Sequence, residues 1–163
     1  HIINDINGGS EELFKLTKKY NAGLFLMHKR GTPKEMQKKL NPRANMVKEF
    51  DKFIEKRLKI LNKMKFNLKK VWFDPGIGFG KTLNQNLQLM RSLSKYSHKN
   101  LQILLGSSRK SWINFIDPSN ADQRIGGSLA SITHALQQNV NTFRIHDVQE
   151  TNQMIKVLKV LNK

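Results

Sequence analysis

Short apolar segments that alternate with helix-period segments constrain this chain more than any other feature. Each apolar segment is too short for a helix and is followed by a polar or glycine-rich turn. Their apolar residues run without the alternation of a half-exposed sheet, which favours strands buried on both faces, as in parallel sheets. The five segments are residues 2–6, 24–28, 71–74, 101–106 and 140–145.

Helix-period segments follow these predicted strands, so the expected order is a repeated βα unit. Ser10 can cap the first helix, and the longest helix is expected from about Asn45 to Phe66, with one apolar stripe. Further helices are expected after a capping box at Thr82 and Gln85, along Leu129, Ile132 and Leu136, and after an acidic cap at Asp147 and Glu150.

A repeated βα order fits two architectures, an open doubly wound sheet or a (β/α) barrel. A doubly wound sheet binds ligands mainly at one switch point, whereas a barrel gathers residues from many strand ends around one mouth. Every predicted strand here ends in polar or reactive groups, which favours the barrel. These groups are Asn4 and Asp5, then His28, Asp74, residues 108–110 (SRK), and Arg144 with His146.

The length of the chain indicates how much of a barrel it can form. Eight βα units take about 250 residues, whereas this chain has 163 residues. We therefore expect an α/β fold of about five βα units around a parallel sheet. Residues 1–163 would be the C-terminal portion of a single (β/α)8 TIM-barrel domain.

Composition narrows the class of protein further. The chain has no Cys, which excludes a disulfide framework and a Cys-based zinc site. Its apolar runs fall far short of the roughly 18 residues needed to span a bilayer, and its first residues show no signal-peptide pattern. We therefore expect a cytoplasmic protein with no membrane partner.

The basic charge of the chain raises the question of a nucleic acid partner. There are 29 Lys and Arg against 12 Asp and Glu, a formal charge of +17, and residues 29–70 hold 15 of the cations but only 4 of the acids. A nucleic-acid surface would also present aromatic side chains for stacking, but Phe50 and Phe53 fall on the apolar stripe. We expect a solvated helix face and no nucleic acid partner, with a basic RNA-binding module as the alternative.

Residues 74–82 (DPGIGFGKT) carry the densest chemical signal. They match a phosphate-binding P-loop only in part, because Pro75 stands where the first glycine is required and lacks an N–H. Asp74 ends a predicted strand before a stiff turn, where its carboxylate can accept paired N–H donors from a flat heterocycle. A simple cap or turn role for Asp74 is the alternative.

Three other strand ends carry candidate binding groups. Residues 107–111 (SSRKS) open a predicted helix, where backbone N–H groups and nearby cations suit an anion or a carbonyl oxygen. Arg144 and His146 point the same way on a strand and would form a clamp for phosphate or diphosphate. Met27 would offer an apolar, polarizable wall to a planar ligand, or else fill the core.

Taken together, these segments resemble the dihydropteroate synthase family, the pterin-binding barrels that sulfonamides inhibit. Six motifs match in family order and with family-like spacing, from one end of the chain to the other. They are residues 2–9 (IINDINGG), 26–37 (LMHKRGTPKEMQ), 73–86 (FDPGIGFGKTLNQN), 104–113 (LLGSSRKSWI), 124–130 (RIGGSLA) and 143–151 (FRIHDVQET).

The resemblance implies a transferase of folate biosynthesis. It would join (7,8-dihydropterin-6-yl)methyl diphosphate to 4-aminobenzoate, giving dihydropteroate and pyrophosphate. By matching motif, the catalytic residues would be Asp74, Lys110, Arg144 and His146. The pterin would contact Asn4, Ile6, Met27, Asp74, Lys110 and Arg144. 4-Aminobenzoate would contact Phe79, Lys110 and Ser111, and pyrophosphate would contact Arg144 and His146.

The resemblance also implies Mg²⁺, a homodimer and sulfonamide inhibitors. The family's metal-binding Asn lies on the first barrel strand, outside the matched motifs, so we expect no metal ligand in this chain. For the same reason we expect the chain alone to be inactive, and its incorporation of radiolabelled 4-aminobenzoate would contradict this. The alternative family is the pterin-binding methyltransferases that carry methyltetrahydrofolate, which should lack the SRKS and RxHD motifs found here.

Overall fold

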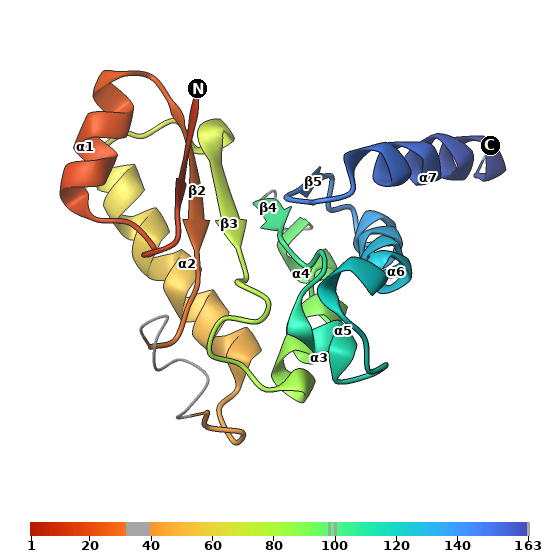
Figure 1. The fold of residues 1–163 in the computed structure, drawn as a ribbon. Helices are drawn as coiled ribbons and strands as arrows, with labels where there is room; N and C mark the ends of the chain where they lie inside the picture. Colours follow the sequence, from red (N-terminus) through yellow and green to blue (C-terminus); the bar gives the residue numbers. More distant parts are fainter. Residues whose placement is uncertain (32–39, 98, 100, 163) are drawn as a thin grey trace.

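The computed structural model describes residues 1–31, 40–97, 99 and 101–162. Five parallel strands form one sheet in the sequence order β1-β2-β3-β4-β5 (Figure 1). They are β1 (Ile2–Asp5), β2 (Gly23–Met27), β3 (Val71–Asp74), β4 (Gln102–Leu105) and β5 (Thr142–Phe143). Neighbours in sequence are neighbours in the sheet, as in a barrel and unlike a doubly wound sheet. The predicted parallel βα fold of five units is therefore confirmed.

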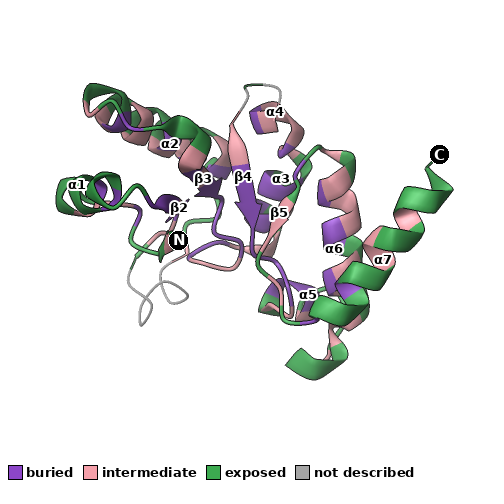
Figure 2. Cartoon of the chain, turned by 90° about the horizontal axis from the view of Figure 1, so that it is seen from above, coloured by how far each residue is buried: buried purple, intermediate pink, exposed green. Residues whose placement is uncertain are grey.

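The helices follow the strands as predicted. They are α1 (Glu11–Lys19), α2 (Met46–Lys63), α3 (Leu83–Arg91), α4 (Ser94–Ser97), α5 (Ser111–Asn114), α6 (Ile125–Gln137) and α7 (Val148–Leu161). Seen from above, the sheet curves, and α7 at the C-terminal end is largely exposed (Figure 2). Residues 32–37 of the second matched motif, and His98, lie outside the described residues.

Two predicted helix caps, at Ser10 and Thr82, are present and the third, at Asp147, is not, whereas Asn45 provides a cap that was not predicted. The Ser10 hydroxyl accepts from the N–H of Leu13, Asn45 caps α2, and Thr82 forms the capping box with Gln85. Asp147 stands at the N-cap of α7, but its side chain makes no cap hydrogen bond. The prediction of an acidic cap was wrong because the carboxylate is paired with Arg109 instead.

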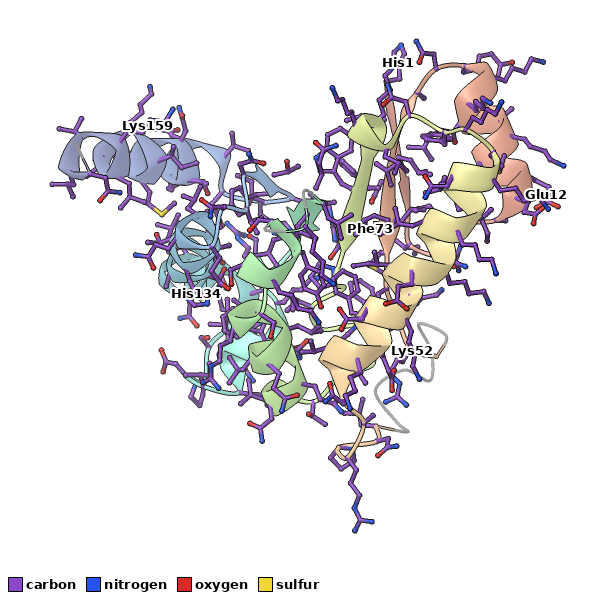
Figure 3. The ribbon with its side chains drawn as sticks, turned by 180° about the vertical axis from the view of Figure 1, so that it is seen from behind. His1, Glu12, Lys52, Phe73, His134 and Lys159 are labelled. Atoms are coloured by element: carbon purple, nitrogen blue, oxygen red, sulfur yellow. The ribbon has the colours of Figure 1, made fainter. Side chains whose placement is uncertain are left out.

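The side of the sheet that faces the helices holds the main core. Its strand residues are buried and belong to one hydrophobic cluster: Leu24, Leu26, Val71, Phe73, Ile103 and Leu105. Phe73 lies between β3 and α2 (Figure 3), where its ring meets that of Phe53 edge-on at 6.4 Å. Phe50 on α2 is fully buried and meets Tyr96 of α4 at 5.0 Å.

The other side of the sheet carries the residues that matter for the site. Register pairs Asn4 with Phe25, Met27 with Asp74, and Leu104 with Thr142. Because side chains alternate along a strand, these residues share the face opposite the helices. In a barrel this face is the interior, and ligands bind at the carboxyl ends of its strands.

Strand β5 is shorter than the predicted segment 140–145. Only Thr142 and Phe143 pair in register with β4, opposite Leu104 and Leu105. The N–H of Arg144 still donates to the carbonyl of Leu105 at 3.0 Å, so the backbone follows β4 for one more step. Arg144 therefore lies beside the carboxyl end of β4, on the same face as Thr142.

Candidate active site

Asp74 is the most deeply buried acid at the carboxyl ends of the strands. Its side chain is 1% exposed and accepts the N–H of Gly76 at 2.7 Å. Burial raises the pKa of this carboxyl, and the positive charges of Lys110, Arg144 and Lys81 counteract that shift. The carboxylate therefore caps its own turn and also feels the charges of three cations, which a turn role alone does not require.

The turn after Asp74 depends on glycine. Gly76 has φ +64°, and a Cβ there would lie 1.9 Å from the carbonyl oxygen of His28. Two N–H groups of the turn bind acceptors within the protein: Gly78 donates to Asn86 of α3 at 2.8 Å, and Phe79 donates to the carbonyl of Gly76 at 3.1 Å. A P-loop turns such groups toward a phosphate, so the geometry agrees with the rejection of a P-loop.

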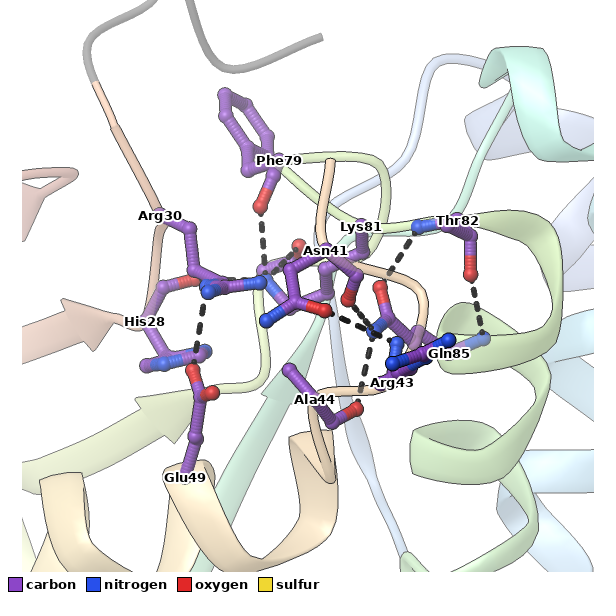
Figure 4. Close-up of polar contacts among 11 residues, drawn as sticks. His28, Arg30, Asn41, Arg43, Ala44, Glu49, Phe79, Lys81, Thr82 and Gln85 are labelled. Atoms are coloured by element: carbon purple, nitrogen blue, oxygen red, sulfur yellow. Dashed lines mark hydrogen bonds and ion pairs between the residues drawn. The ribbon is translucent and has the colours of Figure 1, made fainter. Parts of the chain in front are cut away.

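Lys81 stabilises this turn from beneath, a role that the sequence did not indicate. Its ammonium donates to the carbonyls of Gly76 at 2.8 Å, Phe79 at 3.0 Å and His28 at 3.2 Å (Figure 4). The side chain is 3% exposed, and burial lowers its pKa to about 7. Three convergent carbonyls could be found only from coordinates, because two of them belong to one loop and the third to another.

Lys110 reaches across from the β4–α5 loop to the Asp74 turn. Its ammonium donates to the carbonyl of Ile77 at 2.5 Å and lies 4.6 Å from the centroid of the Phe79 ring. Burial lowers the pKa of Lys110 to about 8, with Arg144 acting in the same direction and Asp74 opposing it. Lys110, Phe79 and Asp74 thus form one cluster, as the matched motifs predicted.

Arg144 completes this cluster from β5. Its guanidinium packs against Gly106, where an added Cβ would lie 3.2 Å from Nη2. Its charge acts on both Asp74 and Lys110. The glycine at the end of β4 therefore gives the guanidinium room to lie across the strand ends.

His146 lies next to the β4–α5 loop and is exposed. Its Nδ1 is 3.1 Å from the hydroxyl of Ser108, which also lies 3.4 Å from the backbone nitrogen of His146. Asp147 next to it binds Arg109 through both carboxylate oxygens, one contact being Arg109 Nε to Oδ2 at 3.0 Å. The sequence motif predicted the pair Arg144 and His146 but gave no sign of these supporting contacts.

The residues that the resemblance assigns to the pterin at the ends of β1 and β2 differ in exposure. Asn4 is exposed on the inner face, Ile6 is 39% exposed just beyond β1, and Met27 beside Asp74 is 1% exposed. Asp5 instead accepts the N–H groups of Asn7 and Gly9 and so shapes its own turn.

His28 does not belong to the group of residues at the carboxyl ends of the strands that face the inner side of the sheet. It is 7% exposed, and its ring lies 5.9 Å from that of Phe50 and 5.5 Å from that of Phe53, on the helix side of the sheet. Burial lowers its pKa to about 3, which keeps it neutral. Counting His28 among the mouth residues was therefore wrong, because it follows Met27 by one position and so faces the opposite way.

The residues predicted to open an anion-binding helix are used differently. α5 has four residues, and Ser111 is its exposed first residue. The N–H of Arg109 already donates to the hydroxyl of Ser128 at 2.9 Å. The N–H of Arg109 is therefore engaged within the protein, and Lys110 is the cation that this loop directs toward the Asp74 turn.

Metal and membrane binding were tested on the described part of the chain. Within it, no group of three or more His, Asp or Glu side chains could hold a metal ion. No metal role is therefore assigned to the described residues. None of the helices described is long and apolar enough to cross a membrane.

A sheet of five sequential parallel strands, with a charged cluster at its carboxyl ends, defines the class of (β/α) barrel enzymes. Comparison with known proteins gives the family. Residues 1–146 match the family model described as pterin binding enzyme, and the chain belongs to this family.

Similar proteins bear the names of folate enzymes. The chain is 34% identical to dihydropteroate synthase of Escherichia coli K12 over 161 residues, covering 98% of this chain and 56% of the relative. It is also 34% identical to the bifunctional dihydropteroate synthase/dihydropteroate reductase of Helicobacter pylori, covering 99% of this chain and 42% of the relative. The chain thus spans about half the length of the curated relatives it matches.

Solved structures show the same arrangement of elements. The Yersinia pestis dihydropteroate synthase with a sulfonamide drug matches with a TM-score of 0.91 at 31% identity, over 99% of this chain and 59% of that one. The Thermus thermophilus enzyme in complex with 6HMPPP matches with a TM-score of 0.89 at 29% identity, over 100% and 65%. The sheet is therefore a portion of a TIM barrel, as predicted.

Proposed function

We propose that this chain supplies the pterin-, 4-aminobenzoate- and diphosphate-binding side of a dihydropteroate synthase. The observation that carries the proposal is the cluster of Asp74 at the end of β3, Lys110 in the loop after β4 and Arg144 just after β5, whose charges act on one another. Its support is the family membership and the Thermus thermophilus structures with 6HMPPP and with 4-aminobenzoate.

The buried acid and the cations suit the two ends of a pterin diphosphate. Asp74 would accept N–H donors from the polar edge of the pterin, with Asn4 assisting from β1, while Ile6 and Met27 flank the ring. Charge-assisted hydrogen bonds of this kind are worth roughly 1.5–3 kcal/mol each. Arg144 and His146 would hold the diphosphate, for which the fork of a guanidinium is well shaped.

The reaction exchanges one bond for another at the methylene carbon of the pterin. The C–O bond breaks and its electron pair leaves with the diphosphate, and the amine nitrogen of 4-aminobenzoate then forms the C–N bond and loses a proton. Arg144 and His146 would stabilise the negative charge that develops on the departing oxygen, and Asp74 would stabilise positive charge spread over the pterin. Little acid–base chemistry is needed from the protein.

The second substrate would lie on the Lys110 side of the cluster. Phe79 offers a ring face, Lys110 a cation, and Ser111 a hydroxyl at the start of α5 for the carboxylate. Sulfonamides would compete for this position. The proposal further includes a homodimer, a cytoplasmic location and no nucleic acid partner.

Calorimetry with the dihydropterin diphosphate tests the proposal on the chain itself. We expect saturable binding that weakens at least tenfold in Asp74→Asn, which removes the negative charge but keeps the acceptor for Gly76. Asp117→Asn, at an exposed position after α5, is the matched control and should leave binding unchanged. Failure of the unmodified chain to bind, or equal affinity of Asp74→Asn, would overturn the proposal.

A further inference from the structure

Two loops at the carboxyl end of the sheet are joined by side-chain contacts to which the proposed function assigns no role. The first follows β4 and contains Ser108, Arg109 and Lys110, and the second follows β5 and contains His146 and Asp147. Arg109 grips Asp147 through Nε and Nη2, and Ser108 meets His146. We name these four residues, Ser108, Arg109, His146 and Asp147, the interlock.

Two adjacent cations, Arg109 and Lys110, have different partners. Lys110 faces the buried Asp74 cluster, whereas the charge of Arg109 is spent on Asp147, whose side chain is 7% exposed. The Arg109 side chain is about a third exposed, at 33%. Two donors of Arg109 are thus engaged by Asp147, whereas the next residue, Lys110, reaches the Asp74 turn.

The backbone of Arg109 is held in a conformation that needs support. Its φ is +56°, in the left-handed region that non-glycine residues seldom adopt. α6 supplies the support, because Ser128 accepts the N–H of Arg109 at 2.9 Å and Arg124, which precedes α6, donates to its carbonyl at 3.0 Å. Arg109 is therefore held through its N–H, its carbonyl and its side chain, and these contacts fix the path of the loop through a strained backbone conformation.

Ser108 occupies a position from which it can orient the imidazole of His146. It is 3% exposed, and among the described residues its hydroxyl has contacts only with His146, through the backbone nitrogen at 3.4 Å and Nδ1 at 3.1 Å. An oxygen that accepts the backbone N–H has its own hydrogen free to donate to Nδ1. A neutral His146 would then carry its proton on Nε2, the nitrogen that points away from Ser108.

We propose that Ser108 and the Arg109–Asp147 pair are positioning residues that fix His146 with Nε2–H presented to the diphosphate. This inference rests on the proposed function, which places the diphosphate at Arg144 and His146. Ser108 sets the ring's tautomer, and the ion pair keeps the two loops at the spacing that Ser108 and His146 require. The two loops thereby bring Lys110 and His146 to opposite ends of one ligand.

The test combines two measurements on the ¹⁵N-labelled chain. Two-bond ¹H–¹⁵N spectra report the tautomer of His146 without any ligand, and calorimetry with inorganic diphosphate reports affinity. We expect an Nε2–H imidazole in the unmodified chain, and in Ser108→Ala a loss of that preference with roughly tenfold weaker binding. Arg109→Met should weaken binding similarly, and Arg109→Lys, which keeps the charge but loses the fork, should recover only part of it.

Matched controls separate positioning from general damage. Ser92→Ala removes a hydroxyl that donates to Gln88 at the end of α3, and Arg91→Met removes an exposed guanidinium. Neither should change the His146 spectrum or the affinity, and thermal unfolding identifies any variant that does not fold. Should Ser108→Ala not fold, Arg109→Lys gives the same readouts with a smaller change.

The outcomes distinguish this inference from the proposed function. An Nδ1–H or mixed tautomer of His146 in the unmodified chain overturns the proposed positioning role. The same holds if Ser108→Ala and Arg109→Met bind diphosphate with an affinity within twofold of that of the unmodified chain. If the unmodified chain binds no diphosphate, the proposed function fails at this position. The spectra of the free chain then still decide whether Ser108 sets the tautomer of His146.

Discussion

Replacing Lys81 by methionine should change how the stability of this chain depends on pH. Lys81 is buried beneath the turn that follows Asp74, and its pKa is about 7 in the folded chain against an ordinary value of 10.5. Between these two values the folded chain has lost the proton of Lys81 while the unfolded chain keeps it. Unfolding then takes up a proton, so raising the pH makes unfolding less favourable.

The size of the effect follows from the two pKa values. One pKa unit corresponds to about 1.4 kcal/mol, so Lys81 can change the free energy of unfolding by about 5 kcal/mol across the whole window. Between pH 7 and pH 9 the linkage relation gives about 2 kcal/mol. At pH 9 we also expect Lys81→Met to be the less stable protein by roughly 1–3 kcal/mol, because the neutral amine can still donate to two of the carbonyl oxygens of Gly76, Phe79 and His28, and methionine to none.

Urea unfolding at pH 7, 8 and 9 measures this difference. The unmodified chain should gain about 2 kcal/mol over Lys81→Met between pH 7 and pH 9, while groups common to both cancel in the comparison. Lys52→Met, at an exposed position on α2 (Figure 3), is the matched control and should follow the unmodified chain. Equal pH slopes for Lys81→Met and the unmodified chain would refute the reasoning.

Three further predictions concern the core, the turn and the site. Phe50→Ala, at a fully buried position, should lower the free energy of unfolding by about 3–5 kcal/mol in denaturant titration, and a loss below 1 kcal/mol would contradict the packing. Gly76→Ala should lower the free energy of unfolding by more than about 2 kcal/mol, because its Cβ would meet the His28 carbonyl, and it should weaken pterin binding by displacing the turn. Unchanged binding in calorimetry would contradict the turn geometry. The affinity for the dihydropterin diphosphate should fall as the pH rises through about 8, because Lys110, which is proposed to contact the pterin, loses its proton there, and Lys110→Met should flatten that profile in calorimetry. An equally steep profile in the variant would assign the titration to another group.

Much of the fold was predictable because each element has a local cause. Val71–Asp74 is an apolar run closed by a turn, and it is found as a strand with those bounds. Thr82 and Gln85 lie three residues apart, and their reciprocal hydrogen bonds start α3. Parallel order also followed, because helices separate the strands.

The parts that could not be predicted depend on contacts between segments far apart in the chain. Asp147 precedes a helix, as a cap would, but an arginine 38 residues earlier binds its carboxylate. His28 ends a strand, as a mouth residue would, yet parity turns it toward Phe50 and Phe53. A local sequence pattern predicts the element in which a residue lies. The residue that its side chain contacts depends on the face of the sheet it occupies and on the loops that the fold brings close to it.

Lys81 and Arg109 show why charge in the sequence is a poor guide to charge in a site. Both lie within the matched motifs, next to residues proposed to contact substrate, and both are cations. Yet Lys81 donates to three carbonyls and Arg109 pairs with one carboxylate, and Lys110 and Arg144 are the other cations whose charge acts on Asp74 among the residues described. A cation that donates to backbone carbonyls or pairs with a carboxylate holds loops in place, and under the proposed function the pterin diphosphate would be held by Lys110 and Arg144 instead.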